Sequence, residues 1–229
     1  MRSGLLNAEH HFGGSHLGGE PCNVAITAPS RDRDIARVAA QLGAKTLATV
    51  RQVHGCRVVE LWGYETAEQL AEIQADALIS ARPGLAVGVL TADCVPVLIE
   101  AQSRGMVAAV HAGRAGMLAG IVPVAVAALI ERGASLDDLR IAVGPHIAAE
   151  SYEVGEGLWA ELPEAAQHRA ADGRICCDLA GLLRQQCNAL GLRADQIDWL
   201  AVDTLNSPNH HSYRRDAGAA GRQLSAIAP

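Results

Sequence analysis

The feature that most constrains the fold is a pair of apolar segments, VPVLIE (residues 95–100) and MVAAVH (residues 106–111), with the turn signal SRG between them. Two apolar runs on either side of a glycine-containing turn predict an antiparallel β-hairpin. With a two-residue loop at Ser103 and Arg104, the numbers of paired residues sum to 207. The hairpin therefore determines which residues of the two strands face each other.

A cysteine and a histidine lie at the same end of this hairpin. In the predicted register Pro96 faces His111, and Cys94 lies diagonally across from His111. Because side chains alternate between the two faces of a strand, Cys94 and His111 point to one face. A register slip of one residue would place them on opposite faces, so the geometry permits a shared ligand without requiring one.

The remaining elements indicate the fold class. Helical periodicity is clearest over residues 31–42, 66–73, 117–132 and 178–190, and further strand-like segments occupy residues 46–52, 58–61, 77–79, 86–90, 141–143 and 199–202. Strands outnumber helices without a strict βαβ order, which favours mixed sheets over a doubly wound parallel sheet. No glycine-rich nucleotide-binding loop follows a strand, and no linker interrupts the chain. We therefore expect a single domain over residues 1–229, an α/β (α+β) fold of mixed β-sheets flanked by helices.

Composition excludes several classes of partner. The balance of 19 basic and 25 acidic residues gives a net charge of −6, which supplies no electrostatic footprint for nucleic acid. No apolar run is long enough to span a bilayer, and the N-terminus lacks the apolar region of a signal peptide. We expect a soluble cytoplasmic protein that binds neither nucleic acid nor membrane. Its six cysteines are then core residues, free thiols or ligands rather than a disulfide framework.

A third candidate ligand joins the pair at the end of the hairpin. His54 stands in the segment RQVHG, at the end of a predicted strand and before a glycine. Two imidazoles and one thiolate would form a zinc site with an open fourth position, as in catalytic zinc centres. The spacings match no short zinc signature. A Cys94 nucleophile with a His111 base, or a cysteine that only fills the core, fits the same residues.

Groups that suit an anion lie close to these candidates in the sequence. The His111 strand runs into HAGRAG, a glycine-rich turn that opens a helix, and helix starts attract anions. Near the C-terminus, Ser212 and Arg214 stand together in HSYRRD, and a guanidinium can grip phosphate in a forked geometry. Asp93, next to Cys94, can orient a ligand or take a proton.

Taken in order, the segments RQVHG, ADAL, TADCVPVL, VAAVHAG, GPHI with SYEVG, HSYRRD and GRQ resemble the motifs of the YfiH, or laccase-domain, family. The resemblance extends from about residue 23 to residue 223. It implies a zinc ion held by His54, Cys94 and His111. It also implies phosphorolysis of adenosine, inosine, guanosine or methylthioadenosine, and deamination of adenosine. Copper-dependent oxidation of phenols and peptidoglycan editing are attached to the family as well.

The chain departs from the family pattern beside the candidate site. HAGRAG stands where HAGWRG is usual, so Arg114 replaces the tryptophan and Ala115 replaces the arginine. Arg114 would then have to take over the role of that arginine from a neighbouring position. Asn23 matches the asparagine of the family's NLG motif. The candidate substrate contacts are Asn23, Arg114, Ser212 and Arg214.

The leading hypothesis is a cytoplasmic zinc enzyme that acts on purine nucleosides and phosphate. Its candidate catalytic residues are His54, Asp93, Cys94 and His111. A copper-dependent polyphenol oxidase (laccase) is the first alternative, although the chain has few of the His-x-His pairs that a multicopper centre needs. A metal-free Cys/His hydrolase and a binding protein with a structural metal are the others.

Overall fold

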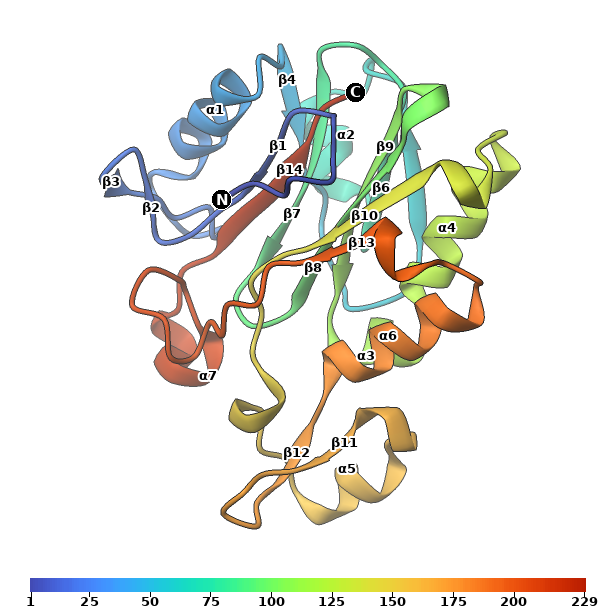
Figure 1. Cartoon of the computed structure of the whole chain (residues 1–229). Coiled ribbons are helices and arrows are strands. Elements are labelled where there is room, and N and C mark those ends of the chain that lie inside the picture. The colour runs from blue at the N-terminus through green and yellow to red at the C-terminus, as the bar shows by residue number, and fades with distance from the viewer.

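The computed structural model describes residues 1–229, in which two mixed β-sheets pack face to face (Figure 1). The larger sheet has the order β13-β10-β8-β9-β6-β5 and contains β5 (Val58–Leu61), β6 (Ala77–Ser80), β8 (Val95–Ala101), β9 (Met106–Ala112), β10 (Leu139–Val143) and β13 (Ile197–Trp199). The smaller has the order β1-β14-β7-β4 and contains β1 (His10–Phe12), β4 (Thr46–Ala48), β7 (Leu85–Thr91) and β14 (Gln223–Ile227). Both sheets combine parallel and antiparallel pairs. The predicted fold class is confirmed.

Helices cover the outer faces of this sandwich. Helix α1 packs on the smaller sheet, and α3, α4 and α6 pack on the larger one (Figure 1). The helices are α1 (Arg31–Gln41), α2 (Ala67–Glu72), α3 (Arg114–Leu118), α4 (Ile121–Glu131), α5 (Glu156–Glu161), α6 (Leu179–Ala189) and α7 (Tyr213–Asp216). Two small hairpins, β2 (His16–Leu17) with β3 (Glu20–Pro21) and β11 (Gln167–Arg169) with β12 (Ile175–Cys177), complete the chain.

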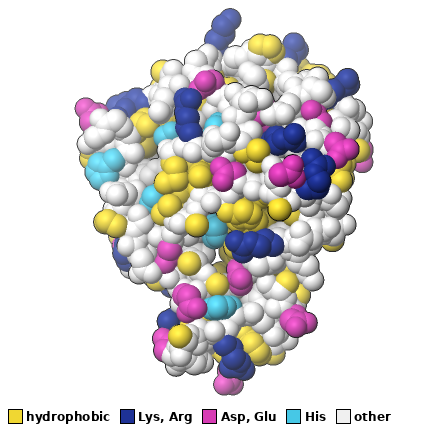
Figure 2. Space-filling model, viewed as in Figure 1, with side chains coloured by type: hydrophobic (Ala, Val, Ile, Leu, Met, Phe, Trp, Pro, Cys, Tyr) yellow, Lys and Arg dark blue, Asp and Glu magenta, His cyan; other side chains and the backbone are white.

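Charged side chains of the two signs are mixed over the surface. On the face in Figure 2, basic and acidic groups are interspersed and neither forms a broad patch. Many of them pair closely, as Arg132 does with Glu60 and Arg193 with Asp137, each at 2.6 Å. None of the helices has both the length and the apolar composition that crossing a membrane requires.

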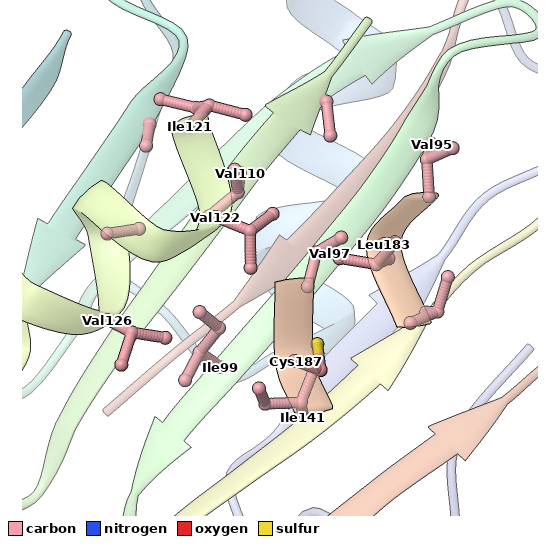
Figure 3. Packing of buried hydrophobic residues seen from close by; sticks show 14 of the residues in the cluster. Val95, Val97, Ile99, Val110, Ile121, Val122, Val126, Ile141, Leu183 and Cys187 are labelled. Carbon is pink, nitrogen blue, oxygen red and sulfur yellow. The ribbon is translucent and has the colours of Figure 1, made fainter. Parts of the chain in front are cut away.

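The central strands are buried on both faces. Along β8, Val97 and Ile99 point to α4 and α6 (Figure 3), whereas Leu98 between them belongs to the cluster that fills the space between the two sheets. This alternation follows from strand geometry, and burial on both faces explains why the sequence of β8 is almost continuously apolar.

The predicted hairpin has the predicted register. Strands β8 and β9 pair antiparallel, with Pro96 opposite His111. The loop is longer than predicted, because Gln102–Arg104 forms a turn of 3-10 helix and Gly105 takes the left-handed conformation at φ 58°. The hydroxyl and backbone N–H of Ser103 donate to Asp138, which holds this turn out of the ladder. The extra residues are added symmetrically, so the register does not change.

Three predicted elements are corrected. The helix predicted over residues 117–132 is the pair α3 and α4, because Gly120 lies at φ 80° and ends the first helix. The strand predicted over residues 46–52 ends at Ala48, and Gln52 instead binds the backbone N–H and C=O of Leu90 through its side chain, at 2.7 and 2.8 Å. The strand predicted over residues 199–202 is β13, shifted toward the N-terminus.

Replacement of Leu183 by alanine is expected to lower the free energy of unfolding by about 2–5 kcal/mol, because Leu183 on α6 is fully buried against the larger sheet and its removal leaves a cavity. Urea unfolding followed by circular dichroism measures the change. Val124→Ala, at an exposed position of α4, serves as the control and should change stability by no more than about 0.5 kcal/mol.

Candidate active site

Three potential ligands meet beside the hairpin. The ligand atoms of His54, Cys94 and His111 all lie within 4.8 Å of one another, and no other group of three His, Cys, Asp or Glu residues comes together in this way. Cys94 immediately precedes β8 and His111 is the penultimate residue of β9. By strand alternation both belong to the face that looks toward the smaller sheet, as the predicted register requires.

A buried carboxylate, Asp76, holds the other two ligand segments in place. Its Oδ1 accepts hydrogen bonds from Nδ1 of His111 at 2.7 Å and from the backbone N–H of His54 at 2.9 Å. Its Oδ2 accepts from the N–H groups of Gly55 at 2.8 Å and Val53 at 3.2 Å. Burial alone would raise the pKa of Asp76, but these bonds hold it below its usual value. The carboxylate is therefore ionised, and each of its two oxygens accepts two hydrogen bonds.

Asp76 has a role that the sequence did not reveal. The segment ADAL was part of the family resemblance, but nothing in it singled out the aspartate. Its function depends on the pairing of β6 with β9, which also gives the backbone bond from the N–H of His111 to the carbonyl of Asp76 at 2.7 Å. A lone acidic residue at the start of a predicted strand was the one signal available.

His54 lies on a loop rather than at a strand end, which corrects the sequence prediction. Its φ is 59°, in the left-handed region that costs a non-glycine residue about 1–2 kcal/mol. The bonds from the backbone N–H groups of Val53, His54 and Gly55 to Asp76 offset this cost and fix the loop. The conformation directs the imidazole toward Cys94, with 3.9 Å between Nε2 and Sγ.

The electrostatics of the three residues favour a thiolate. Burial would raise the pKa of Cys94, but hydrogen bonds and positive charge from His111 and His54 outweigh burial and lower it to about 6. Burial would likewise lower the pKa of His111, yet Asp76 and the Cys94 thiolate raise it to about 9. Because Nδ1 of His111 is bound to Asp76, its Nε2 is the nitrogen that faces Cys94.

These donors fit a metal ion such as zinc. A thiolate and two imidazoles are borderline-soft donors, and a histidine held through its other nitrogen by a carboxylate is the usual outer arrangement of a zinc ligand. Three protein ligands leave a coordination position free. The donor set therefore suits a metal that is in contact with a substrate.

Two glycines let the segments approach this closely. A Cβ at Gly113 would lie 2.7 Å from Cδ2 of His54 and 3.2 Å from Sγ of Cys94. A Cβ at Gly116 would lie 2.6 Å from the carbonyl oxygen of Gly55. The glycines of HAGRAG thus provide room for the His54 loop as well as a turn.

All three ligands line a pocket of about 910 Å³. Arg114 at the start of α3 and Arg214 in α7 also line it, and their predicted contact with substrate stays a prediction. Arg214 lies over the ring of Tyr152, with its guanidinium carbon 5.0 Å from the ring centre. The pocket thus contains positive charge and aromatic surface next to the ligand cluster.

Asn23 and Ser212, also predicted as substrate contacts, lie outside the lining of this pocket. The side-chain oxygen of Asn23 accepts from the N–H groups of Ala25 and Arg222, each at 3.0 Å. The buried Ser212 hydroxyl caps α7 by accepting from the N–H of Arg215. Both side chains shape the backbone that carries lining residues, and direct contact with substrate stays a prediction.

Asp93 connects the ligand cluster to the C-terminal segment. It lies at φ 84°, and its carboxylate accepts from the hydroxyl of Thr204 at 2.6 Å and from the backbone N–H of Arg214 at 2.7 Å. Both oxygens are occupied, which suits a positioning role for Asp93 better than proton transfer. The sequence also missed Arg31, Arg222, Tyr152 and Tyr213 as lining residues, although SYEVG, SYRRD and GRQ contain three of them.

Comparison with known proteins places the chain in a family. The model of the family described as multi-copper polyphenol oxidoreductase laccase matches residues 16–229. The chain belongs to this laccase family. The resemblance to YfiH and laccase-domain proteins is thereby confirmed.

Curated proteins similar to this chain are named purine nucleoside phosphorylases. A purine nucleoside phosphorylase of Deinococcus radiodurans is 36% identical over 203 residues, which cover 84% of this chain and 74% of that protein. A purine nucleoside phosphorylase of Streptomyces griseus is 39% identical over 186 residues, covering 79% and 74% of the two chains.

Solved structures share the fold. YfiH from Bacillus licheniformis has a TM-score of 0.79 and 26% identity, covering 97% of this chain and 89% of its own. YlmD from Geobacillus stearothermophilus has a TM-score of 0.81 at 22% identity, covering 98% and 88%.

Replacement of Asp76 by asparagine is expected to weaken zinc binding about 10–100-fold, since the carboxylate orients His111 and fixes the loop of His54. Competition with a chromogenic chelator measures the affinity. Asp172→Asn, at an exposed turn, is the control. Wild-type affinity in Asp76→Asn would rule out this orienting role.

The Cys94 thiol of chelator-treated protein is expected to react with iodoacetamide at a rate that rises through pH about 6, because its lowered pKa makes it a thiolate above that pH. The exposed Cys56 is replaced by serine to remove its background reaction, and peptide mass spectrometry follows the modification. Cys177 and Cys187, whose burial raises the pKa of each thiol to about 11, should stay unmodified. A rate that rises only near pH 9 would contradict the proposed electrostatics.

Proposed function

We propose that this protein is a zinc-dependent enzyme of purine nucleosides, which cleaves adenosine, inosine, guanosine or methylthioadenosine with phosphate and also deaminates adenosine. The observation that carries the proposal is the pocket in which His54, Cys94 and His111 lie together with Arg114 and Arg214. The names of the curated relatives support the same substrate class.

The residues have distinct parts in this proposal. In phosphorolysis, positive charge grows on the ribose while phosphate is held beside the anomeric carbon, so the enzyme needs fixed anion-binding groups. Arg114 and Arg214 supply them, and the ring of Tyr152 supports the guanidinium of Arg214. The half-exposed ring of Tyr213 offers apolar surface to the base. Bound zinc, held by His54, Cys94 and His111, would supply Lewis-acid polarisation.

Asp93 acts as a positioning residue. By binding Thr204 and the backbone of Arg214 it ties the C-terminal segment to Cys94, its neighbour in the chain. The guanidinium of Arg214 is further steered by its bond to the carbonyl of Glu153 at 2.9 Å. The phosphate contact and the ligand cluster are therefore held at a fixed separation.

The family's description names a multicopper oxidase, and the ligand count argues against that chemistry here. A centre with several copper ions needs more imidazoles than the two that meet in this pocket. A metal-free hydrolase is the second candidate, because Cys94 with a pKa of about 6 beside a histidine resembles an activated nucleophile. The following experiment separates these activities.

Wild type, Cys94→Ala and Cys56→Ser protein, purified without an affinity histidine tag, are analysed for metals and then incubated with adenosine and phosphate. We expect about one zinc per chain in wild type and in Cys56→Ser, and loss of both zinc and turnover in Cys94→Ala. Cys56 is the matched control because it is exposed and outside the pocket lining. Chromatography identifies the product, with adenine from phosphorolysis and inosine from deamination.

Other outcomes would contradict the proposal. Full activity in zinc-free wild type that an alkylating agent abolishes would favour the hydrolase. Copper in place of zinc, with oxidation of phenols and no nucleoside turnover, would favour the oxidase.

A further inference from the structure

The pocket has more positive charge than a neutral nucleoside and one phosphate require. Four arginines line it: Arg31, Arg114, Arg214 and Arg222. The single acidic lining residue is Asp93, and both of its carboxylate oxygens already accept hydrogen bonds, from Thr204 and from a backbone N–H. The pocket thus has a surplus of cations in a chain whose net charge is −6.

Three of these four arginines form no ion pair, and the fourth has only a distant one. Arg114, Arg214 and Arg222 form no salt bridge, and the closest carboxylate oxygen to Arg31 is that of the fully exposed Asp32, at 3.9 Å. Arg31 donates to the hydroxyl of Thr49, and Arg222 donates to the carbonyls of Ala220 and Gly221. A half-buried guanidinium with only neutral acceptors is best satisfied by an anionic ligand.

The four arginines fall into two groups according to the segments that carry them. Arg114 follows His111 by three residues, and the backbone of Arg214 is bonded to Asp93, the neighbour of Cys94. This first pair is adjacent to the ligand cluster and provides the phosphate contact of the proposed function.

The second pair, Arg31 and Arg222, is organised by Asn23. The side-chain oxygen of Asn23 accepts a hydrogen bond from the backbone N–H of Arg222 at 3.0 Å. The backbone carbonyl of Asn23 accepts one from the hydroxyl of Ser30, which is next to Arg31, at 3.2 Å. The guanidinium of Arg222 also lies 5.7 Å from the ring centre of Tyr213. Tyr213 and both arginines line the pocket, and the guanidinium of Arg222 lies next to the ring of Tyr213.

We propose that Arg31 and Arg222 form a second anion subsite, which binds a phosphate carried by the substrate, so that the preferred substrates are purine nucleoside monophosphates. The inference rests on the proposed function. One inorganic phosphate carries a charge between about −1 and −2 near neutral pH, which the two positive charges of Arg114 and Arg214 offset. A substrate phosphate matches the second pair in the same way.

The reaction stays balanced with such a substrate. The bond from the ribose anomeric carbon to the purine nitrogen breaks, and its electron pair leaves with the base, which takes up the proton that the attacking hydrogen phosphate gives up. A bond forms from the anomeric carbon to an oxygen of inorganic phosphate. The phosphate already on the substrate is unchanged, so the products are the free base and a ribose bisphosphate.

The test compares kcat/KM for inosine 5′-monophosphate with kcat/KM for inosine, in wild type, Arg31→Met and Arg222→Met. We expect wild type to prefer the monophosphate by about tenfold or more, and each substitution to lower that ratio about tenfold. Arg82→Met, at an exposed position outside the pocket lining, should keep the wild-type ratio. A purely structural effect of a substitution would lower both values and leave the ratio unchanged.

The outcomes separate this inference from the proposed function. Turnover of inosine without preference for the monophosphate overturns the subsite. A second outcome also overturns the subsite: the rate depends on inorganic phosphate through Arg31, so that Arg31→Met removes this dependence, and the monophosphate is not preferred. The pair would then bind free phosphate. If neither substrate is turned over, the proposed function fails, and calorimetry then decides: the subsite requires that the monophosphate binds more tightly than inosine and that Arg31→Met removes the difference.

Discussion

The candidate site depends on one buried carboxylate. Asp76 accepts hydrogen bonds from the side chain of His111 and from three consecutive backbone N–H groups around His54. The same two oxygens therefore fix one residue on a strand and one on a loop. The left-handed conformation of His54 is tolerable only because those bonds offset it. Cys94 needs no such support, since the hairpin register already places it opposite the end of β9. The cluster therefore combines one ligand fixed by sheet pairing with two that are fixed by Asp76.

Much of this could be predicted from the sequence, and the reason is locality. The hairpin of β8 and β9 is set by adjacent apolar runs and a turn, so its register, and with it the approach of Cys94 to His111, followed from counting residues. The mixed sheets followed from the irregular order of helices and strands. His54 was found through the chemistry of its side chain, although the prediction placed it at the end of a strand that in fact stops at Ala48.

The rest depends on contacts between distant parts of the chain. Strand β14 lies between β1 and β7, yet its sequence, QLSAI, is short and contains buried polar residues, so it gave no strand signal. Arg31 and Arg222 line one pocket although they are far apart in sequence, and each alone has the pattern of an ordinary surface residue. Asp76 likewise reaches His111 only because β6 pairs with β9. The roles of such residues depend on how distant segments pair and pack, and the local sequence pattern carries no information on that.

The two glycines of HAGRAG have a consequence for how this pocket can change during evolution or in the laboratory. Any side chain at Gly113 or Gly116 would collide with the His54 loop, whereas Arg114 and Ala115 between them face the cavity. Within these four residues, two positions are sterically restricted to glycine and the two between them are not. A library that randomises residues 114 and 115 would sample new specificities while leaving the ligand geometry intact, and the departure of this chain from the usual HAGWRG is one natural sample of that kind.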